Sequence, residues 1–141
     1  MTRHILERTF EALIDAGINP AEIRGTNTNV YSSTSFSEFD LAWFTDNKGG
    51  YGLMGRNRCF NANRVSYWLD VNGSSMSADG SFANGILNIY NGYQSIKNDR
   101  CDIALVNTAS FQDIPEAALQ LKHLKGLSKD GMCKPYDDSG E

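Results

Sequence analysis

The stretch of the sequence best placed to do chemistry is Ser75 to Asn88, SMSADGSFANGILN. A run of small residues predicts a short strand over residues 75–79, which breaks at Asp79-Gly80-Ser81 before a helical pattern opens near Phe82. Many α/β enzymes mount a nucleophile at such a turn, because the first backbone N–H groups of the helix point at it. Here the place is taken by a phenylalanine, which has no lone pair to attack with and no proton to lose.

Substitutes for a nucleophile at this turn are poor. Ser81 and Ser77 carry hydroxyls close to the turn, but no histidine lies near them in the sequence, and hydroxyls at turns usually cap the following helix. The chain has two histidines, His4 and His123, one in the first predicted helix and one in the last. Their positions favour ordinary helix residues over an acid–base pair.

The three cysteines, Cys59, Cys101 and Cys133, are widely spaced and form no C-x-x-C pair. An odd count with this spacing is untypical of a disulfide framework or a zinc site and is typical of a reducing compartment. We therefore expect a cytoplasmic protein with no metal ion and no other cofactor.

Composition narrows the class of protein further. The chain has 141 residues, a formal net charge of −4 and a pI near 5.1, which disfavours nucleic acid and anionic lipid as partners. No apolar run approaches the roughly 20 residues of a membrane span, and the N-terminal segment is unlike a signal peptide. The length predicts one domain over residues 1–141.

The elements that must position the turn follow from periodicity. A helix is predicted over residues 4–17, a strand over 28–36, helical structure within 51–71, a strand from Cys101 and a last helix from Pro115. Alternating strands and helices indicate a layered α/β fold with crossover connections. The helix after the turn is apolar around much of its circumference, which predicts a central, buried helix; its large apolar residues are Ile86, Leu87, Ile89, Tyr90, Tyr93 and Ile96.

These residues also carry a family resemblance. The run YGLMGRNRCFNANRVSYWLDVNGSSMSADGSFANGILNIYNGYQSIKNDRCDIALV resembles the ketoacyl synthase (condensing) domain of animal-type fatty acid synthases and of polyketide synthases. Similar stretches flank it, so the resemblance covers nearly the whole chain. It implies a thiolase-like α/β fold, with five layers in a complete domain built from two similar halves. Residues 1–141 would form part of the N-terminal half.

The resemblance implies a reaction and a departure from it. The family condenses acyl and malonyl thioesters, and its nucleophilic cysteine lies in a pattern similar to D-T-A-C-S-S-S-L. Asp79 to Ile86 match that pattern, with Phe82 at the cysteine's position and Asp79, Ser81 and Ala83 flanking it. The family's two catalytic histidines lie in a C-terminal half with no counterpart in these residues. We therefore expect a member of this transferase family that is catalytically inactive.

Further departures lie on two predicted strands. Asn29, Ser32 and Ser33 stand where the family has a glycine-containing apolar strand, and Asn107 and Thr108 stand where it has small paired glycines. Together these changes indicate that the requirements of a tight active-site floor are no longer met.

Two alternatives stay open beside an inactive synthase. One is a non-catalytic module that binds lipid or a protein partner through Phe82 and other aromatic residues, namely Trp43, Phe44, Tyr67, Trp68, Tyr90 and Tyr93. The other is a surviving enzyme with an unusual nucleophile. By resemblance, the partners would be acyl thioesters or acyl carrier protein, and a homodimer would form through about Cys101 to Asn107.

Overall fold

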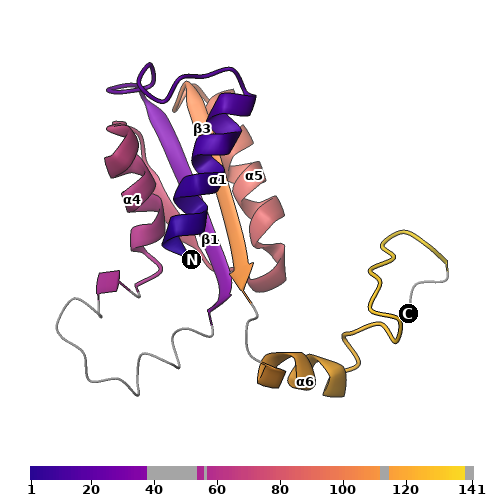
Figure 1. Ribbon diagram of the computed structural model, residues 1–141. Coiled ribbons are helices and arrows are strands. Elements are labelled where there is room, and N and C mark those ends of the chain that lie inside the picture. The colour runs from indigo at the N-terminus through magenta and orange to yellow at the C-terminus, as the bar shows by residue number, and fades with distance from the viewer. Residues whose placement is uncertain (38–53, 56, 112–114, 139–141) are drawn as a thin grey trace. The chain divides into compact units, whose positions relative to one another are not determined.

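The computed structural model describes residues 1–37, 54–55, 57–111 and 115–138 (Figure 1). The chain divides into two compact units, Met1–Phe111 and Gln112–Glu141. The first unit holds a parallel three-stranded sheet in the order β2-β1-β3. Its strands are β1 (Thr28–Ser37), β2 (Ser75–Ala78) and β3 (Ile103–Phe111).

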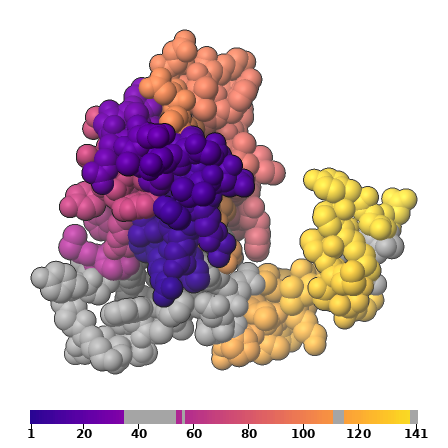
Figure 2. Space-filling model, turned by 45° about the horizontal axis from the view of Figure 1, so that its top comes forward, coloured from indigo at the N-terminus to yellow at the C-terminus, as the bar shows by residue number. Residues whose placement is uncertain are grey.

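Among the described residues of the first unit, the helical elements beside the sheet include α1 (Thr2–Asp15), α4 (Phe60–Leu69), the short 3₁₀ helix η1 (Ser81–Ala83) and α5 (Asn84–Lys97). Helices α1 and α4 cover one face of the sheet, and α5 covers the other (Figure 1). Figure 2 shows the indigo N-terminal residues packed beside the magenta residues of α4. All connections between the parallel strands are crossovers, as the alternation of elements predicts.

Alternate residues of β1 face opposite sides of the sheet. Val30 is fully buried in the apolar core that β1 shares with α1 and α4. The next residue, Tyr31, points to the other side, where its hydroxyl lies 2.6 Å from the Ser95 hydroxyl on α5. The apolar core of the first unit therefore lies between the sheet and the α1/α4 layer; its buried members are Ile5, Leu13, Ile23, Val30, Ala62, Val65 and Leu69.

Most predicted elements are confirmed with small shifts of their ends. The first helix ends before Gly17, which has a φ of +73° that suits a glycine at a helix terminus. The helical pattern within 51–71 gives α4, which ends at Asp70 in the left-handed conformation; part of that segment, residues 51–53 and 56, lies outside the described residues. A Cβ atom at Gly73 would come within 2.2 Å of the Thr28 carbonyl oxygen, so only glycine lets this turn pass β1 so closely.

The predicted burial of α5 needs correction. Its apolar residues do not face the sheet, and each of the six is between 41% and 80% exposed. The side against the sheet instead carries the buried small and polar residues Asn84, Asn88, Gly92 and Ser95. A Cβ atom at Gly92 would lie 3.3 Å from both the Ala104 Cβ and Val106 Cγ2 atoms, so a larger residue would push the helix away from β3.

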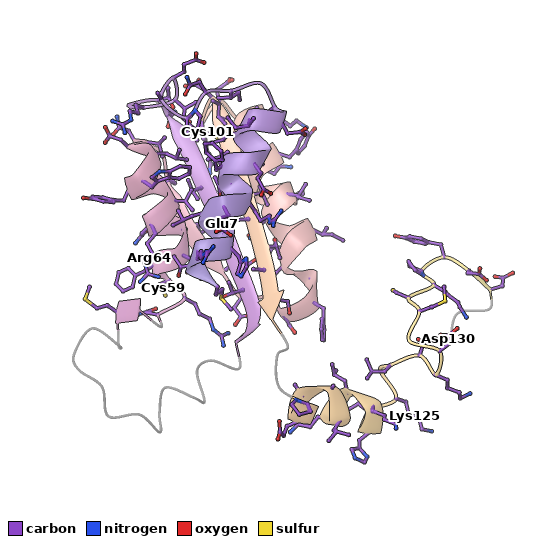
Figure 3. The ribbon with its side chains drawn as sticks, viewed as in Figure 1. Glu7, Cys59, Arg64, Cys101, Lys125 and Asp130 are labelled. Atoms are coloured by element: carbon purple, nitrogen blue, oxygen red, sulfur yellow. The ribbon has the colours of Figure 1, made fainter. Side chains whose placement is uncertain are left out.

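The second unit contains α6 (Pro115–His123), which begins at the predicted proline. The N–H group of Gly126 donates to the carbonyl of Leu121 and closes the end of this helix. Farther along, the Lys134 ammonium lies 2.7 Å from the Asp130 carboxylate (labelled in Figure 3) and holds the pKa of that carboxyl below its usual value. None of the residues of α6 is buried.

The placement of the core yields a stability prediction. Leu69 is 1% exposed, so Leu69→Ala leaves a cavity and should lower the free energy of unfolding by about 2–5 kcal/mol in urea titrations. Tyr67, two residues away on the same helix, is 88% exposed, and Tyr67→Ala should change stability by less than about 0.5 kcal/mol. Equal effects of the two substitutions would contradict the assigned core.

Candidate functional site

The predicted strand–turn–helix segment lies between β2 and α5. Strand β2 ends at Ala78, η1 spans Ser81–Ala83, and α5 runs from Asn84 for 14 residues. Because the strands are parallel, the turn lies at the carboxyl edge of the sheet, where ligands of open α/β sheets usually bind. The Phe82 side chain is 74% exposed at this turn, directly ahead of the helix.

Local hydrogen bonds fix the backbone of the turn. The Ser81 N–H group donates to the Asp79 carboxylate at 3.2 Å, and the Gly80 N–H group donates to the Asn84 side-chain oxygen. The Ala83 N–H group donates to the Gly80 carbonyl at 3.1 Å. Two side chains, one on each side of the turn, therefore hold it in place.

One residue of the turn is strained. Ser81 has a φ of +54°, a left-handed conformation that costs a residue with a Cβ atom about 1–2 kcal/mol. Strain of this kind persists only where neighbouring contacts impose it, and it is common at functional sites. The hydrogen bonds that the Asp79 and Asn84 side chains accept from Ser81 and Gly80 supply such contacts.

The N-terminal end of α5 carries the positive end of the helix dipole. No side chain caps the helix and no acidic residue lies in its first turn, and Phe82 precedes the positive end of its dipole by two residues. That environment would stabilise an anion such as a thiolate. A phenyl ring cannot use it.

The serines and histidines considered as substitutes for a nucleophile lie on different elements. The Ser77 hydroxyl donates to the Cys59 carbonyl at 3.1 Å and so links β2 to the start of α4. His4 lies on α1 with its Nδ1 atom 3.6 Å from the Glu7 carboxylate, and His123 belongs to the second unit. The Ser77 hydroxyl therefore makes a structural contact between two elements of the first unit.

All three cysteines are free thiols. Cys101 is buried just before β3, at the opposite end of the sheet from the turn, and Cys59 is exposed at the start of α4 (Figure 3). Cys133 is exposed in the second unit. Cys59 stands at the start of α4, and its neighbour Arg58 lies with its guanidinium 3.5 Å from the Asp79 carboxylate of the turn.

The sequence did not predict the polar side chains that are buried between α5 and the sheet. On the inner side of α5, the Asn88 amide donates to the Ser33 hydroxyl at 2.9 Å, while the Asn84 amide nitrogen and the Asn88 amide oxygen are buried without a hydrogen-bond partner. On the other face of the sheet, the Thr9 hydroxyl donates to Asn107 at 3.0 Å. The signal in the sequence was the four-residue spacing of Asn84 and Asn88, which puts both on one side of a helix.

Two further observations limit the chemistry of the described residues. Within residues 1–37, 54–55, 57–111 and 115–138, no group of three or more histidine, cysteine, aspartate or glutamate side chains could hold a metal ion. In the same part of the chain, no helix is both long enough and apolar enough to cross a membrane.

Comparison with known proteins identifies relatives along the whole chain. Residues 1–141 match the protein family described as Beta-ketoacyl synthase, N-terminal domain. A fatty acid synthase of Anser anser anser is 39% identical over 141 residues, which cover 99% of this chain and 40% of that protein. Probable polyketide synthase 41 of Dictyostelium discoideum is 36% identical over 135 residues, covering 96% of this chain and 5% of that protein. The chain thus spans less than half the length of either relative.

Solved structures agree with the family match. A ketosynthase from module 6 of the bacillaene synthase of Bacillus subtilis 168 superposes with a TM-score of 0.79 at 26% sequence identity, over 98% of this chain and 22% of that one. An oxazolomycin ketosynthase domain of Streptomyces albus JA3453 superposes with a TM-score of 0.80 at 24% identity, over 99% and 25% of the two chains, and shows the likeness of the fold. The predicted thiolase-like α/β fold is confirmed.

The strain at the turn can be tested with a matched pair of substitutions. Ser81→Gly and Ser81→Ala both remove the hydroxyl, but only glycine adopts a φ of +54° without steric cost. We expect the glycine variant to exceed the alanine variant in free energy of unfolding by about 1 kcal/mol in chemical denaturation. An alanine variant as stable as the glycine variant would show that Ser81 is not held in this conformation.

Proposed function

The chain belongs to the family of beta-ketoacyl synthase N-terminal domains, and on that premise we propose that it is the nucleophile-bearing part of a fatty-acid-synthase-type condensing domain whose nucleophile has been lost. It would then contribute the fold of a condensing enzyme without its covalent chemistry. The similar proteins described above are a fatty acid synthase and a probable polyketide synthase, which supports a role in the condensing part of such a synthase.

The observation that carries the proposal is the identity of residue 82. The turn keeps the features that activate a thiol, namely a position at the carboxyl edge of the sheet and the N-terminal end of a long helix without a side-chain cap. Phe82 stands there with no atom that could form a thioester. Acyl transfer through this position is therefore absent whatever further residues a longer chain would add.

We propose the substrates and the partner of the family for this chain because of its family membership. Acyl thioesters and acyl carrier protein are the molecules that a condensing domain meets, and a scaffold of this kind could retain a surface for either. The predicted dimer contact, Cys101 to Asn107, includes the first half of β3, which has a single neighbouring strand in the described sheet. A free strand edge fits pairing with another strand. The three free cysteines fit the reducing cytoplasm.

A binding role is the second candidate, and one observation favours it. Of the aromatic residues that the sequence offers for a binding surface, Tyr67, Tyr90 and Tyr93 are more than half exposed and Trp68 is 37% exposed, in contrast to core residues. Trp43 and Phe44 lie outside the described residues. Large exposed apolar area is unusual on a monomeric protein and typically marks a surface that binds something.

The absence of covalent chemistry can be tested by intact-mass spectrometry after incubation with an acyl coenzyme A. We expect no acyl adduct at the turn, because the turn holds no cysteine. Cys59→Ser and Cys133→Ser should be introduced together as a control, since exposed thiols can be acylated without catalysis. A stoichiometric adduct that also forms on the Cys59→Ser/Cys133→Ser variant would instead support an enzyme with an unusual nucleophile.

The same samples separate the two candidates. Saturable binding of a fluorescent fatty acyl ligand, with no adduct, would favour the binding module over the inactive synthase. Neither binding nor an adduct is the result that the first proposal predicts.

A further inference from the structure

The loop that leads from α4 into β2 contains an asparagine–glycine pair, Asn72-Gly73. The sequence has three such pairs, and the other two, Asn84-Gly85 and Asn91-Gly92, lie within α5. The Cγ atom of an asparagine is an electrophile that the backbone nitrogen of the next residue can attack. Glycine hinders this attack least, because it has no Cβ atom. The three pairs therefore share one chemistry and differ in their backbone environment.

The backbone nitrogen of Gly73 is accessible for this attack. The N–H group of Asn72 donates to the Thr26 carbonyl at 2.9 Å. The N–H group of Ser74 donates to the Asn29 side-chain oxygen at 2.7 Å. Among the hydrogen bonds of the described residues, none is donated by the Gly73 N–H group between them. Asn72 is also exposed, so water reaches its side chain.

The two pairs in α5 are protected by their helix. An α-helix holds ψ near about −42°, from which the next backbone nitrogen must rotate to reach the Cγ atom. The N–H group of Gly92, in the interior of α5, belongs to the hydrogen-bond ladder of the helix. Asn84 is 1% exposed, and its side-chain oxygen accepts the Gly80 N–H group. Reaction at either pair therefore requires local opening of the helix.

The fold keeps the pair Asn72-Gly73 in place. A Cβ atom at Gly73 would come within 2.2 Å of the Thr28 carbonyl oxygen, so a larger residue would displace the loop from β1. The Asn72 amide donates to the Gly25 carbonyl at 3.0 Å and ties the loop to the segment before β1. This hydrogen bond breaks when the amide leaves, so the folded loop should react more slowly than an unfolded chain.

We propose that Asn72 is a site of spontaneous deamidation in the folded chain. The Gly73 nitrogen attacks the Asn72 Cγ atom, the bond from Cγ to Nδ2 breaks, and ammonia leaves with the proton of the Gly73 N–H group. Water then opens the cyclic imide. Addition of water at Cγ gives aspartate. Addition at the backbone carbonyl carbon gives isoaspartate, in which the main chain runs through the side-chain carbon.

Either product weakens the attachment of β2 to β1. The amide that donates to the Gly25 carbonyl is replaced by a carboxylate, which has no proton to donate. Isoaspartate also adds one backbone atom shortly before Ser74, whose carbonyl accepts the Val30 N–H group at 2.8 Å. Because β2 leads into the turn at Phe82, the modification would loosen that turn as well. The inference does not depend on the proposed function.

Peptide mass spectrometry of the full 141-residue chain, after incubation at mildly alkaline pH, tests the proposal. Trypsin cleaves after Arg64 and Lys97, so one peptide carries all three pairs and its fragment ions compare them in the same molecule. In the folded chain we expect Asn72 to be converted at least about ten times faster than Asn91, which waits for the helix to open. In concentrated urea the three pairs should be converted at similar rates.

Matched variants separate the modification from its consequence. Asn72→Gln keeps an amide whose attack would close a larger ring, so this variant should gain no negative charge in ion-exchange chromatography and keep its urea midpoint during incubation. Asn91→Gln makes the same change within α5 and should behave as the wild-type chain does. Equal conversion of Asn72 and Asn91 in the folded chain would overturn the proposal. A deamidated chain with an unchanged urea midpoint would overturn the loosening of β2.

Discussion

The close packing of α5 on β1 and β3 determines much of the first unit. It rests on what the inner side of the helix lacks: Gly92 has no side chain to hold the helix away from Ala104 and Val106. Two hydrogen bonds then join helix and strand, from Asn88 to Ser33 at 2.9 Å and between the hydroxyls of Tyr31 and Ser95 at 2.6 Å. With the inner side filled by small and polar groups, the large apolar residues of α5 remain on the outside.

The same packing fixes where α5 begins, and hence the turn at its N-terminal end. Asn84 is the first residue of the helix, is 1% exposed, and accepts the Gly80 N–H group. Since α5 is held by the sheet, the turn is held as well, and Phe82 occupies a fixed position at a helix end. The family's reaction needs both this backbone and a sulfur atom on it. In the proposed function, the chain keeps this backbone, and Phe82 stands in place of the residue with the sulfur atom.

The sequence predicted the elements because periodicity and turn residues report local geometry. The spacing of Ile5 and Leu13 placed α1, and Pro115 marked the start of α6. It did not predict which side of α5 faces the sheet, since the helix presents apolar residues over a wide arc and hydrophobicity alone favours burying that arc. The deciding fact was the space beside Gly92, which depends on contacts with β3 that are distant in sequence. The roles of Asn84 and Asn88 depend on the same contacts and were missed for the same reason.

The central claim is that the turn remains a mount for a thiolate and that Phe82 alone removes the reacting atom. The most direct measurement is the apparent pKa of the thiol in Phe82→Cys, obtained from the pH dependence of its alkylation rate in a Cys59→Ser/Cys133→Ser background. We predict a pKa at least about one unit below the ordinary thiol value near 8.5, because the end of α5 stabilises the thiolate. The thiol of Tyr67→Cys, on an exposed side of α4, should titrate near the ordinary value. Equal pKa values for the two thiols would contradict the account.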